Sequence, residues 1–423
     1  MNEPQINEFL IITFLSLFLL LSVIKKYKKK DLKACLFLGI SLITIYCYNG
    51  LAVYDATVPR YFIFMYAVYV VIYFFAFNIT YSCLNRKTKI GNEVKRELFF
   101  TQPSFCKSII ISYVLVNVLI IIVEGKSGNF FKIPELDASV RFERFVTKSN
   151  VSIVSVLLGY INSMLKPLFY ISLYNYRKKL ICVIPLVLLP SYFTVVSTGY
   201  ISRGGLLLPT IMIAVVIYFK IKKNKLLVAS SVVVLFYVII YYSFYLSLYR
   251  RGMDVSNIDF SYALNTLILE EFSYPLHAKQ IINYDKVAGI ADYFLFVITL
   301  PIPKIFLNLH IEEYPILFSE YMLGLDRTSS SFYILLPGCV LESYFIYGKY
   351  LFWIHPLTIA IVSAYICKIS SKQSNFVFFY IYLLISFSWA ISRAGFYSII
   401  PTIIAPFYIF YWLYYYKSVK KNV

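Results

Sequence analysis

Long uncharged stretches alternate along the chain with short segments that carry most of its charged residues. A helix that crosses the hydrocarbon core of a bilayer needs about 20 apolar residues. Uncharged runs of about that length or more cover 34–54, 61–85, 180–202, 226–249, 373–392 and 394–416. Shorter runs, which can also span with help from the membrane interface, cover 9–24, 108–123, 149–165, 204–219 and 350–367. These runs are too long and too uniformly apolar for the strands of a membrane barrel, so the pattern predicts an all-α bundle of transmembrane helices.

About eleven spans are expected, within a range of roughly 10–13. Their expected bounds are 9–24, 34–53, 61–84, 108–124, 149–174, 180–198, 204–219, 226–248, 350–367, 374–391 and 395–416. This map divides the chain into three parts: residues 1–249 with eight transmembrane helices, a large extracytoplasmic loop at 250–349, and residues 350–423 with the last three helices.

Basic residues cluster at alternate connections between the uncharged runs. The clusters are Lys25–Lys33, Lys87–Lys95, Arg177–Lys179, Lys220–Lys225, Lys368–Lys372 and Lys417–Lys421. Cytoplasmic loops are enriched in lysine and arginine, so the N-terminus is expected outside and the C-terminus in the cytoplasm. The net charge of +19 then reflects membrane orientation and gives no reason to expect a nucleic-acid partner. With 14% charged and 60% hydrophobic residues, the composition also belongs to the membrane class.

The segment 250–349 interrupts the alternation of apolar and basic segments. It holds 11 of the 21 acidic residues and is expected on the outer side. Within it, the apolar stretches 293–303 and 328–341 are short enough to be interfacial or re-entrant rather than spanning. Two further spans there would preserve the orientation and raise the helix count.

Arginines are distributed differently from lysines. Eight of them are expected outside or at the outer ends of helices: Arg60, Arg141, Arg144, Arg203, Arg250, Arg251, Arg327 and Arg393. Guanidinium suits bidentate recognition of phosphate or carboxylate. Any one of these arginines can instead pair with an acidic residue of the long loop or anchor a helix at the interface. Arg203 and Arg393 interrupt or end apolar runs, where a charge is a functional candidate by default.

Two motifs carry the candidate chemistry. Ser197–Gly205 is a glycine-rich turn that places Arg203 beside a helix N-terminus, which together make a phosphate seat. The stretches 325–331 and 341–348 contribute Arg327 and Glu342; an apolar, aromatic setting suits a carboxylate for general acid/base work. The alternatives are a snorkelling arginine at the turn and a structural carboxylate paired with an outer arginine. Arg203, Glu342 and Arg327 are thus the candidate catalytic residues.

The remaining outer arginines are candidate substrate-binding residues. They are Arg141, Arg144, Arg250, Arg251 and Arg393. The sequence contains no HExxH, GxSxG, DxD or nucleotide-binding glycine motif, and no CxxC pair among its seven cysteines. No metal and no cofactor are therefore expected.

The layout resembles the Wzy-type oligosaccharide repeat-unit polymerases of bacterial O-antigen and capsule synthesis. The resemblance rests on TGYISRGGLLLP at 198–209, ITLPIPKIF at 298–306, LPGCVLESYFIYG at 336–348, and the long outer loop before the last three helices. It implies glycosyl transfer at the outer face of the bacterial inner membrane, without metal or nucleotide. The growing glycan on undecaprenyl pyrophosphate would be passed to the next lipid-linked repeat unit. The implied partners are these lipid-linked glycans, membrane lipids and a chain-length regulator protein.

Two alternatives remain open. An O-antigen ligase shares the layout, but ligases typically carry a histidine near the end of the long outer loop. Here 325–345 contains none, because His310 lies upstream and His355 falls in a predicted helix. A flippase for lipid-linked repeat units is the rival from another class, and flippases usually spread charged residues through many helices and have internal pseudo-symmetry.

The predicted orientation is tested by reporter fusions. Fusions after Lys33, Lys95, Lys179, Lys225 and Lys372 should report a cytoplasmic location, and fusions within 255–290 an external one. A cytoplasmic signal from 255–290 would overturn both the topology and the placement of the site.

Overall fold

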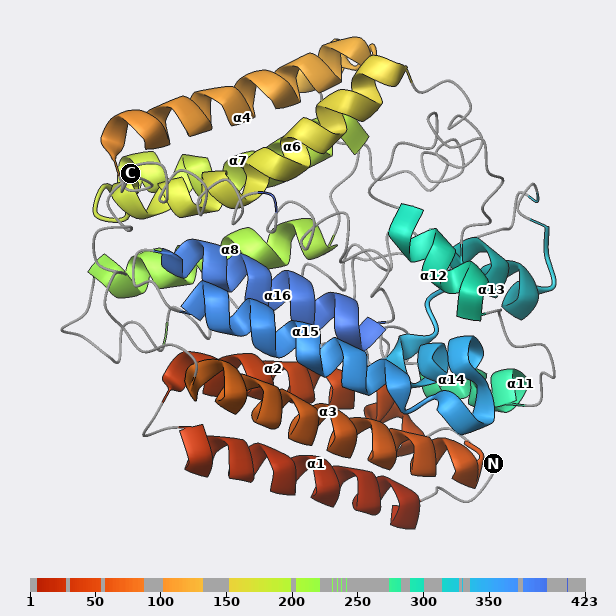
Figure 1. Cartoon of the computed structure of the whole chain (residues 1–423). Helices are drawn as coiled ribbons and strands as arrows, with labels where there is room; N and C mark the ends of the chain where they lie inside the picture. Colours follow the sequence, from red (N-terminus) through yellow and green to blue (C-terminus); the bar gives the residue numbers. More distant parts are fainter. Residues whose placement is uncertain are drawn as a thin grey trace, which may run out of the picture. The chain divides into compact units, whose positions relative to one another are not determined.

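The computed structural model describes the larger part of the chain. The described ranges are 6–27, 31–54, 58–86, 102–131, 152–198, 203–220, 274–282, 290–299, 314–326, 335–371 and 376–393, with a few single positions between and beyond them. Within these ranges every regular element is a helix (Figure 1), which confirms the all-α prediction.

In the described part of the chain, six helices are long and apolar enough to cross a membrane. They are α1 (Ile6–Tyr27), α2 (Leu32–Asn49), α3 (Arg60–Arg86), α4 (Pro103–Val123), α6 (Ile153–Ser172) and α7 (Leu180–Thr198). Shorter apolar helices occur within α8 (Arg203–Lys220), α15 (Ile354–Ser371) and α16 (Val377–Arg393). Each of these helices coincides with a predicted span. The predicted spans 226–248 and 395–416 lie outside the described ranges.

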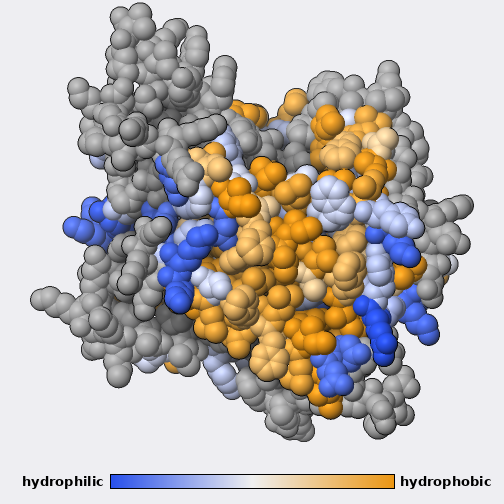
Figure 2. All heavy atoms as spheres, turned by 60° about the horizontal axis from the view of Figure 1, so that its bottom comes forward, coloured by the Kyte–Doolittle hydropathy of each residue, from blue (hydrophilic) through white to orange (hydrophobic). Residues whose placement is uncertain are grey.

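The chain divides into two compact units. Unit 1 comprises residues 1–91, 267–372 and 383–405, and unit 2 comprises 92–266, 373–382 and 406–423. In unit 1, α3 packs along α15, and α1 packs on α2 and α3. Figure 2 shows part of the surface of unit 1 as a broad hydrophobic area. Exposed apolar side chains of α1 and α3, such as Phe14, Phe18 and Phe75, form a surface suited to contact with lipid chains.

Large aromatic side chains form the buried face of α3, which packs on α15, α1 and α2. Phe62, Tyr66, Tyr69, Tyr73, Phe77 and Tyr81 recur at helical spacing on one buried face of α3. The buried residues of α15 include the small side chains of Ala360, Ser363, Ala364 and Cys367. Small residues let two helices approach closely in a membrane, so α15 has room for the rings of α3.

Residues 267–349 of the predicted outer loop belong to unit 1. The helices of this segment are η6 (Tyr274–His277), α11 (Ala278–Ile282), α12 (Ile290–Thr299), α13 (Tyr314–Leu323) and α14 (Gly338–Leu351). Helix α14 contacts α2, α3 and α15, and it continues past residue 349, where the loop was expected to end. Its backbone breaks at Gly348 (φ 70°, ψ −173°), and α15 follows three residues after α14 ends.

In unit 2, α4 packs on α6 and α7 packs on α8. Asn117 of α4 and Asn162 of α6 exchange two side-chain hydrogen bonds, each donated by one Nδ2 to the other Oδ1, at 3.0 and 3.1 Å. This pairing satisfies two amides inside a helix pair that the composition assigns to the membrane, where an unpaired polar group is expensive.

The start of α14 depends on a glycine. Gly338 has a left-handed φ of 73°, and a Cβ there would meet Asn49 Oδ1 at 2.5 Å and Tyr274 Cβ at 3.0 Å. Gly324, in the same unit, also has a left-handed φ (61°), but a Cβ there would meet nothing within 4 Å. The two glycines share the backbone strain that any other residue would suffer and differ in the space around them.

Substitution of these two glycines by alanine separates strain from steric overlap. Gly324→Ala should cost about 1–2 kcal/mol of stability, from the left-handed backbone alone. Gly338→Ala should cost about 1–3 kcal/mol more, because the new methyl group overlaps a closely packed buried amide. Thermal unfolding of the detergent-purified variants measures both. Equal losses would show that the contact with Asn49 is unimportant.

Candidate functional site

Some of the predicted site residues lie within the described ranges of the chain, and the others lie outside them. Glu342 and Arg393 both belong to unit 1. Arg203 is the first residue of α8 in unit 2, as the glycine-rich turn predicted, but its side chain lies outside the described part. Arg141, Arg144, Arg250, Arg251 and Arg327 also lie outside the described residues.

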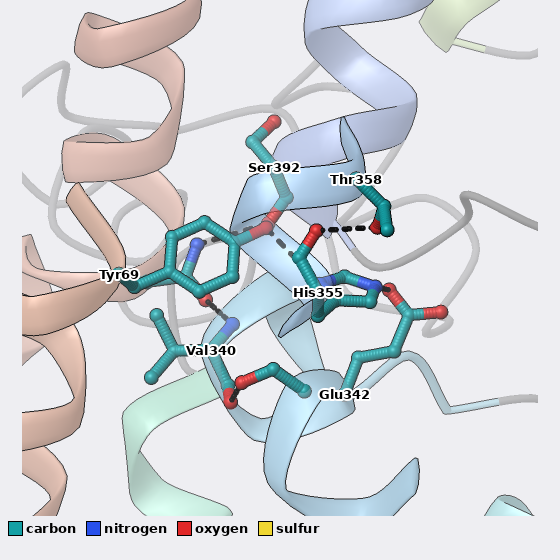
Figure 3. Close-up of polar contacts among 8 residues, drawn as sticks. Tyr69, Val340, Glu342, His355, Thr358 and Ser392 are labelled. Carbon is teal, nitrogen blue, oxygen red and sulfur yellow. Dashed lines mark hydrogen bonds and ion pairs between the residues drawn. The ribbon is translucent and has the colours of Figure 1, made fainter. Parts of the chain in front are cut away.

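Glu342 pairs with a histidine that the sequence did not single out. Its Oε2 lies 3.4 Å from His355 Nε2, and the two side chains are 0% and 1% exposed. They point toward one another from α14 and α15 (Figure 3). On the other side of the imidazole, Nδ1 lies 3.3 Å from the hydroxyl of Tyr69 in α3. Carboxyl, imidazole and phenol therefore lie in a row across three helices, with successive distances of 3.4 and 3.3 Å.

The partner of Glu342 differs from the one considered from the sequence. As the alternative to a catalytic role, Glu342 was considered a structural carboxylate paired with an outer arginine, whereas the described partner is His355. One signal could have identified it: Glu342 and His355 are ionisable residues 13 positions apart, each within apolar sequence. Polar groups in such surroundings generally pair with one another. The prediction failed to connect them because the loop boundary was placed between them.

Arg393, at the end of α16, is surrounded by three aromatic rings. Its Nε donates a hydrogen bond to the hydroxyl of Tyr274 at 2.8 Å. The guanidinium carbon lies 5.1 Å from the ring centre of Trp389 and 5.7 Å from that of Tyr48, within the range of cation–π attraction. We call these four residues the Arg393 cluster. A guanidinium beside aromatic rings suits a ligand that joins a phosphate to sugars, because the rings can stack on the sugar and the cation can bind the anion.

A single buried amide connects the Arg393 cluster to the Glu342–His355 pair. Asn49, the last residue of α2, donates from Nδ2 to the backbone oxygen of Ser392 at 2.9 Å. Its Oδ1 accepts a hydrogen bond from the backbone N–H of Val340 at 3.4 Å. Ser392 immediately precedes Arg393 in the sequence. Val340 lies two residues before Glu342, and both are shown in Figure 3. Asn49 therefore fixes the position of both candidate residues.

Comparison with known proteins finds no protein-family model, no curated protein and no solved structure that matches the chain. Among the described residues, no three histidine, cysteine, aspartate or glutamate side chains come together as a metal site would require. The expectation of a reaction without metal or cofactor stays a prediction.

The buried pair is tested by a double-mutant cycle. Glu342→Leu and His355→Leu should each lower stability by about 3–5 kcal/mol, because each leaves the other group buried without its partner. The double variant should lose less than the sum, with a coupling of about 1–3 kcal/mol. Thermal unfolding in detergent supplies the four values. Strict additivity would contradict an interaction between the two side chains.

Proposed function

We propose that the protein is a membrane glycosyltransferase that polymerises oligosaccharide repeat units carried on undecaprenyl pyrophosphate, at the outer face of the bacterial inner membrane. The observation that carries the proposal is the Arg393 cluster. It places a partly exposed cation among aromatic rings at the end of an apolar helix, a combination that suits a lipid-linked sugar pyrophosphate. The outer arginines and the resemblance to Wzy-type polymerases support the same substrate class.

In the proposed reaction, a hydroxyl oxygen of the acceptor repeat unit attacks the anomeric carbon of the donor glycan. The bond from that carbon to the pyrophosphate oxygen breaks, and undecaprenyl pyrophosphate leaves with the bonding electrons. The hydroxyl proton passes to a base. Because pyrophosphate is already a good leaving group, the enzyme must mainly position the reactants and balance the negative charge that develops.

The arginines divide this task in the proposal. Arg203 and Arg327 contact the leaving pyrophosphate, whereas Arg393, Arg250, Arg251, Arg141 and Arg144 bind the lipid-linked glycans. Glu342 has no exposed surface in this structure. We therefore assign Glu342 and His355 a positioning role: the pair holds α14 against α15 and α3, and Asn49 links the start of α14 to Arg393.

One observation favours the O-antigen ligase as a second candidate. Ligases typically have a histidine near the end of the long outer loop, and the absence of one from 325–345 argued against that function. In the structure His355 lies directly beside Glu342, close to where the loop ends. A histidine thus lies near the end of the loop, at the start of α15, and the two functions must be separated by their products.

Deletion of the gene distinguishes the candidates. Loss of a polymerase should leave single repeat units on the lipid carrier or on the lipopolysaccharide core, with no long chains. Loss of a ligase should leave long chains on the lipid carrier and none on the core. Unchanged glycan ladders would contradict both proposals. Electrophoresis of lipopolysaccharide, together with analysis of the extracted lipid-linked glycans, gives the answer.

Arg203 provides the sharpest test among single residues. Lysine would anchor a helix end as well as arginine does, but it cannot form the two parallel hydrogen bonds that a guanidinium makes to a pyrophosphate. Loss of such a contact should cost about 2–4 kcal/mol of transition-state stabilisation, or roughly 30- to 1,000-fold in rate. Arg203→Lys should therefore accumulate normally yet make few long chains, and Arg203→Ala should make essentially none.

Arg60→Lys is the matched control. Arg60 is an exposed arginine that begins the apolar helix α3, just as Arg203 begins α8, and it has no place in the proposed site. Its replacement should leave the distribution of chain lengths unchanged. If Arg203→Lys also gave normal ladders at matched protein levels, Arg203 would be an interfacial anchor only.

A further inference from the structure

The end of α4 is built so that one carboxylate faces two other helices. Gly125 has a left-handed φ of 70°, and its N–H donates to the Ile122 oxygen at 3.0 Å. The N–H of Lys126 donates to the Ile121 oxygen at 2.9 Å. These two bonds form the Schellman arrangement that ends a helix and satisfies its last carbonyls. Glu124 is the C-cap residue of α4 in this Schellman motif, so the motif fixes its backbone.

Three side chains hold the carboxylate of Glu124. Oε1 accepts a hydrogen bond from the hydroxyl of Ser155 in α6 at 3.1 Å. Oε2 lies 2.7 Å from Lys126 Nζ and accepts from the hydroxyl of Ser197 in α7 at 3.4 Å. All of these residues belong to unit 2. The carboxylate therefore joins the ends of α4 and α7 to the start of α6.

Glu124 remains accessible despite these contacts. Its side chain is 25% exposed, in contrast to the 0% exposure of Glu342. An ionised carboxylate offers about four lone-pair sites, and the three observed contacts leave acceptor capacity for a further donor. Glu124 is thus held in place and still open to a ligand hydroxyl.

The same end of unit 2 carries the turn that leads to Arg203. Ser197, which donates to Glu124, lies six residues before Arg203, and α7 packs on α8. The orientation predicted from the basic clusters places the end of α4 and the turn at 197–205 on the outer side. The hydrogen bond from Ser197 to Glu124 agrees with this prediction, because it brings the end of α7 next to the end of α4.

We propose that Glu124 is the base of the transferase reaction, and this inference rests on the proposed function. Glu124 accepts a hydrogen bond from the attacking hydroxyl of the acceptor sugar. As that oxygen bonds to the anomeric carbon, its proton moves to the Glu124 carboxylate, and undecaprenyl pyrophosphate departs from the opposite side. A general base must lie within hydrogen-bond reach of the proton it takes, which the exposure of Glu124 permits and the burial of Glu342 prevents in this structure.

The test compares Glu124→Gln with Asn129→Ala in membranes supplied with the single lipid-linked repeat units that accumulate in the deletion strain. Glutamine has one oxygen acceptor, so it can keep the hydrogen bond from one of the two serines, and it takes up no proton at neutral pH. Polymerisation should fall by about 100-fold or more, since general bases contribute about 10²- to 10⁴-fold. Asn129→Ala removes a different hydrogen bond of the same region, to the Val196 oxygen at 3.3 Å, and should stay within a few-fold of wild type.

Each outcome decides a separate point. Wild-type membranes that form no polymer would overturn the proposed function and the role of Glu124 with it. Polymerisation by wild type and by Glu124→Gln at similar rates would overturn the role of Glu124 alone. If Glu124→Gln does not accumulate, Glu124→Asp and Glu124→Asn replace it, because they have the same size and differ in the ability to accept a proton. Aspartate should then be at least about tenfold faster than asparagine, and equal rates would refute the proposal.

Discussion

The hydrogen bonds of the Asn49 side chain are the constraint on which the rest of unit 1 depends. Asn49 is 1% exposed and ends a helix whose composition assigns it to the membrane. A buried amide without partners is costly in such surroundings, so its donor and acceptor fix their neighbours. One bond fixes the end of α16, which presents Arg393, and the other fixes the start of α14, which presents Glu342. Val340 lies 291 residues and Ser392 lies 343 residues after Asn49 in the sequence, yet one side chain contacts both.

Hydrogen bonds of buried polar groups also fix neighbouring helices along the buried face of α3. The tyrosine hydroxyls on this face reach polar atoms on other helices: Tyr66 contacts Ser16 of α1, Tyr69 contacts His355 of α15, and Tyr73 donates to Ser363 of α15. The tyrosine rings fill the space between the helices. Each hydroxyl forms a hydrogen bond at one position along the neighbouring helix, which fixes how the two helices align. Unit 1 therefore has a defined arrangement where purely apolar helices could slide. His355 takes part both in this packing and in the candidate site.

Apolar run length was sufficient to predict the long apolar helices that the structure describes, because the thickness of the bilayer sets their length and uncharged sequence marks them. It failed at α14, whose start depends on a left-handed Gly338 and whose break depends on Gly348; neither conformation is encoded in hydrophobicity. The pairing of Glu342 with His355 and the contacts of Glu124 arise from tertiary packing, which run length does not specify. Arg393 could be singled out in advance because a charge at the end of an apolar run is unusual, but two of its three aromatic neighbours, Tyr48 and Tyr274, come from distant segments.

The central claim is that this protein joins lipid-linked repeat units, and reconstitution tests it most directly. The purified protein in lipid nanodiscs would be given only undecaprenyl-pyrophosphate-linked repeat units, and both the glycan and the released lipid would be measured over time. The account predicts a ladder of lipid-linked glycans and one undecaprenyl pyrophosphate released for each new glycosidic bond. The account would be contradicted if the folded protein did not lengthen the glycan, or if the lipid were released without new glycosidic bonds.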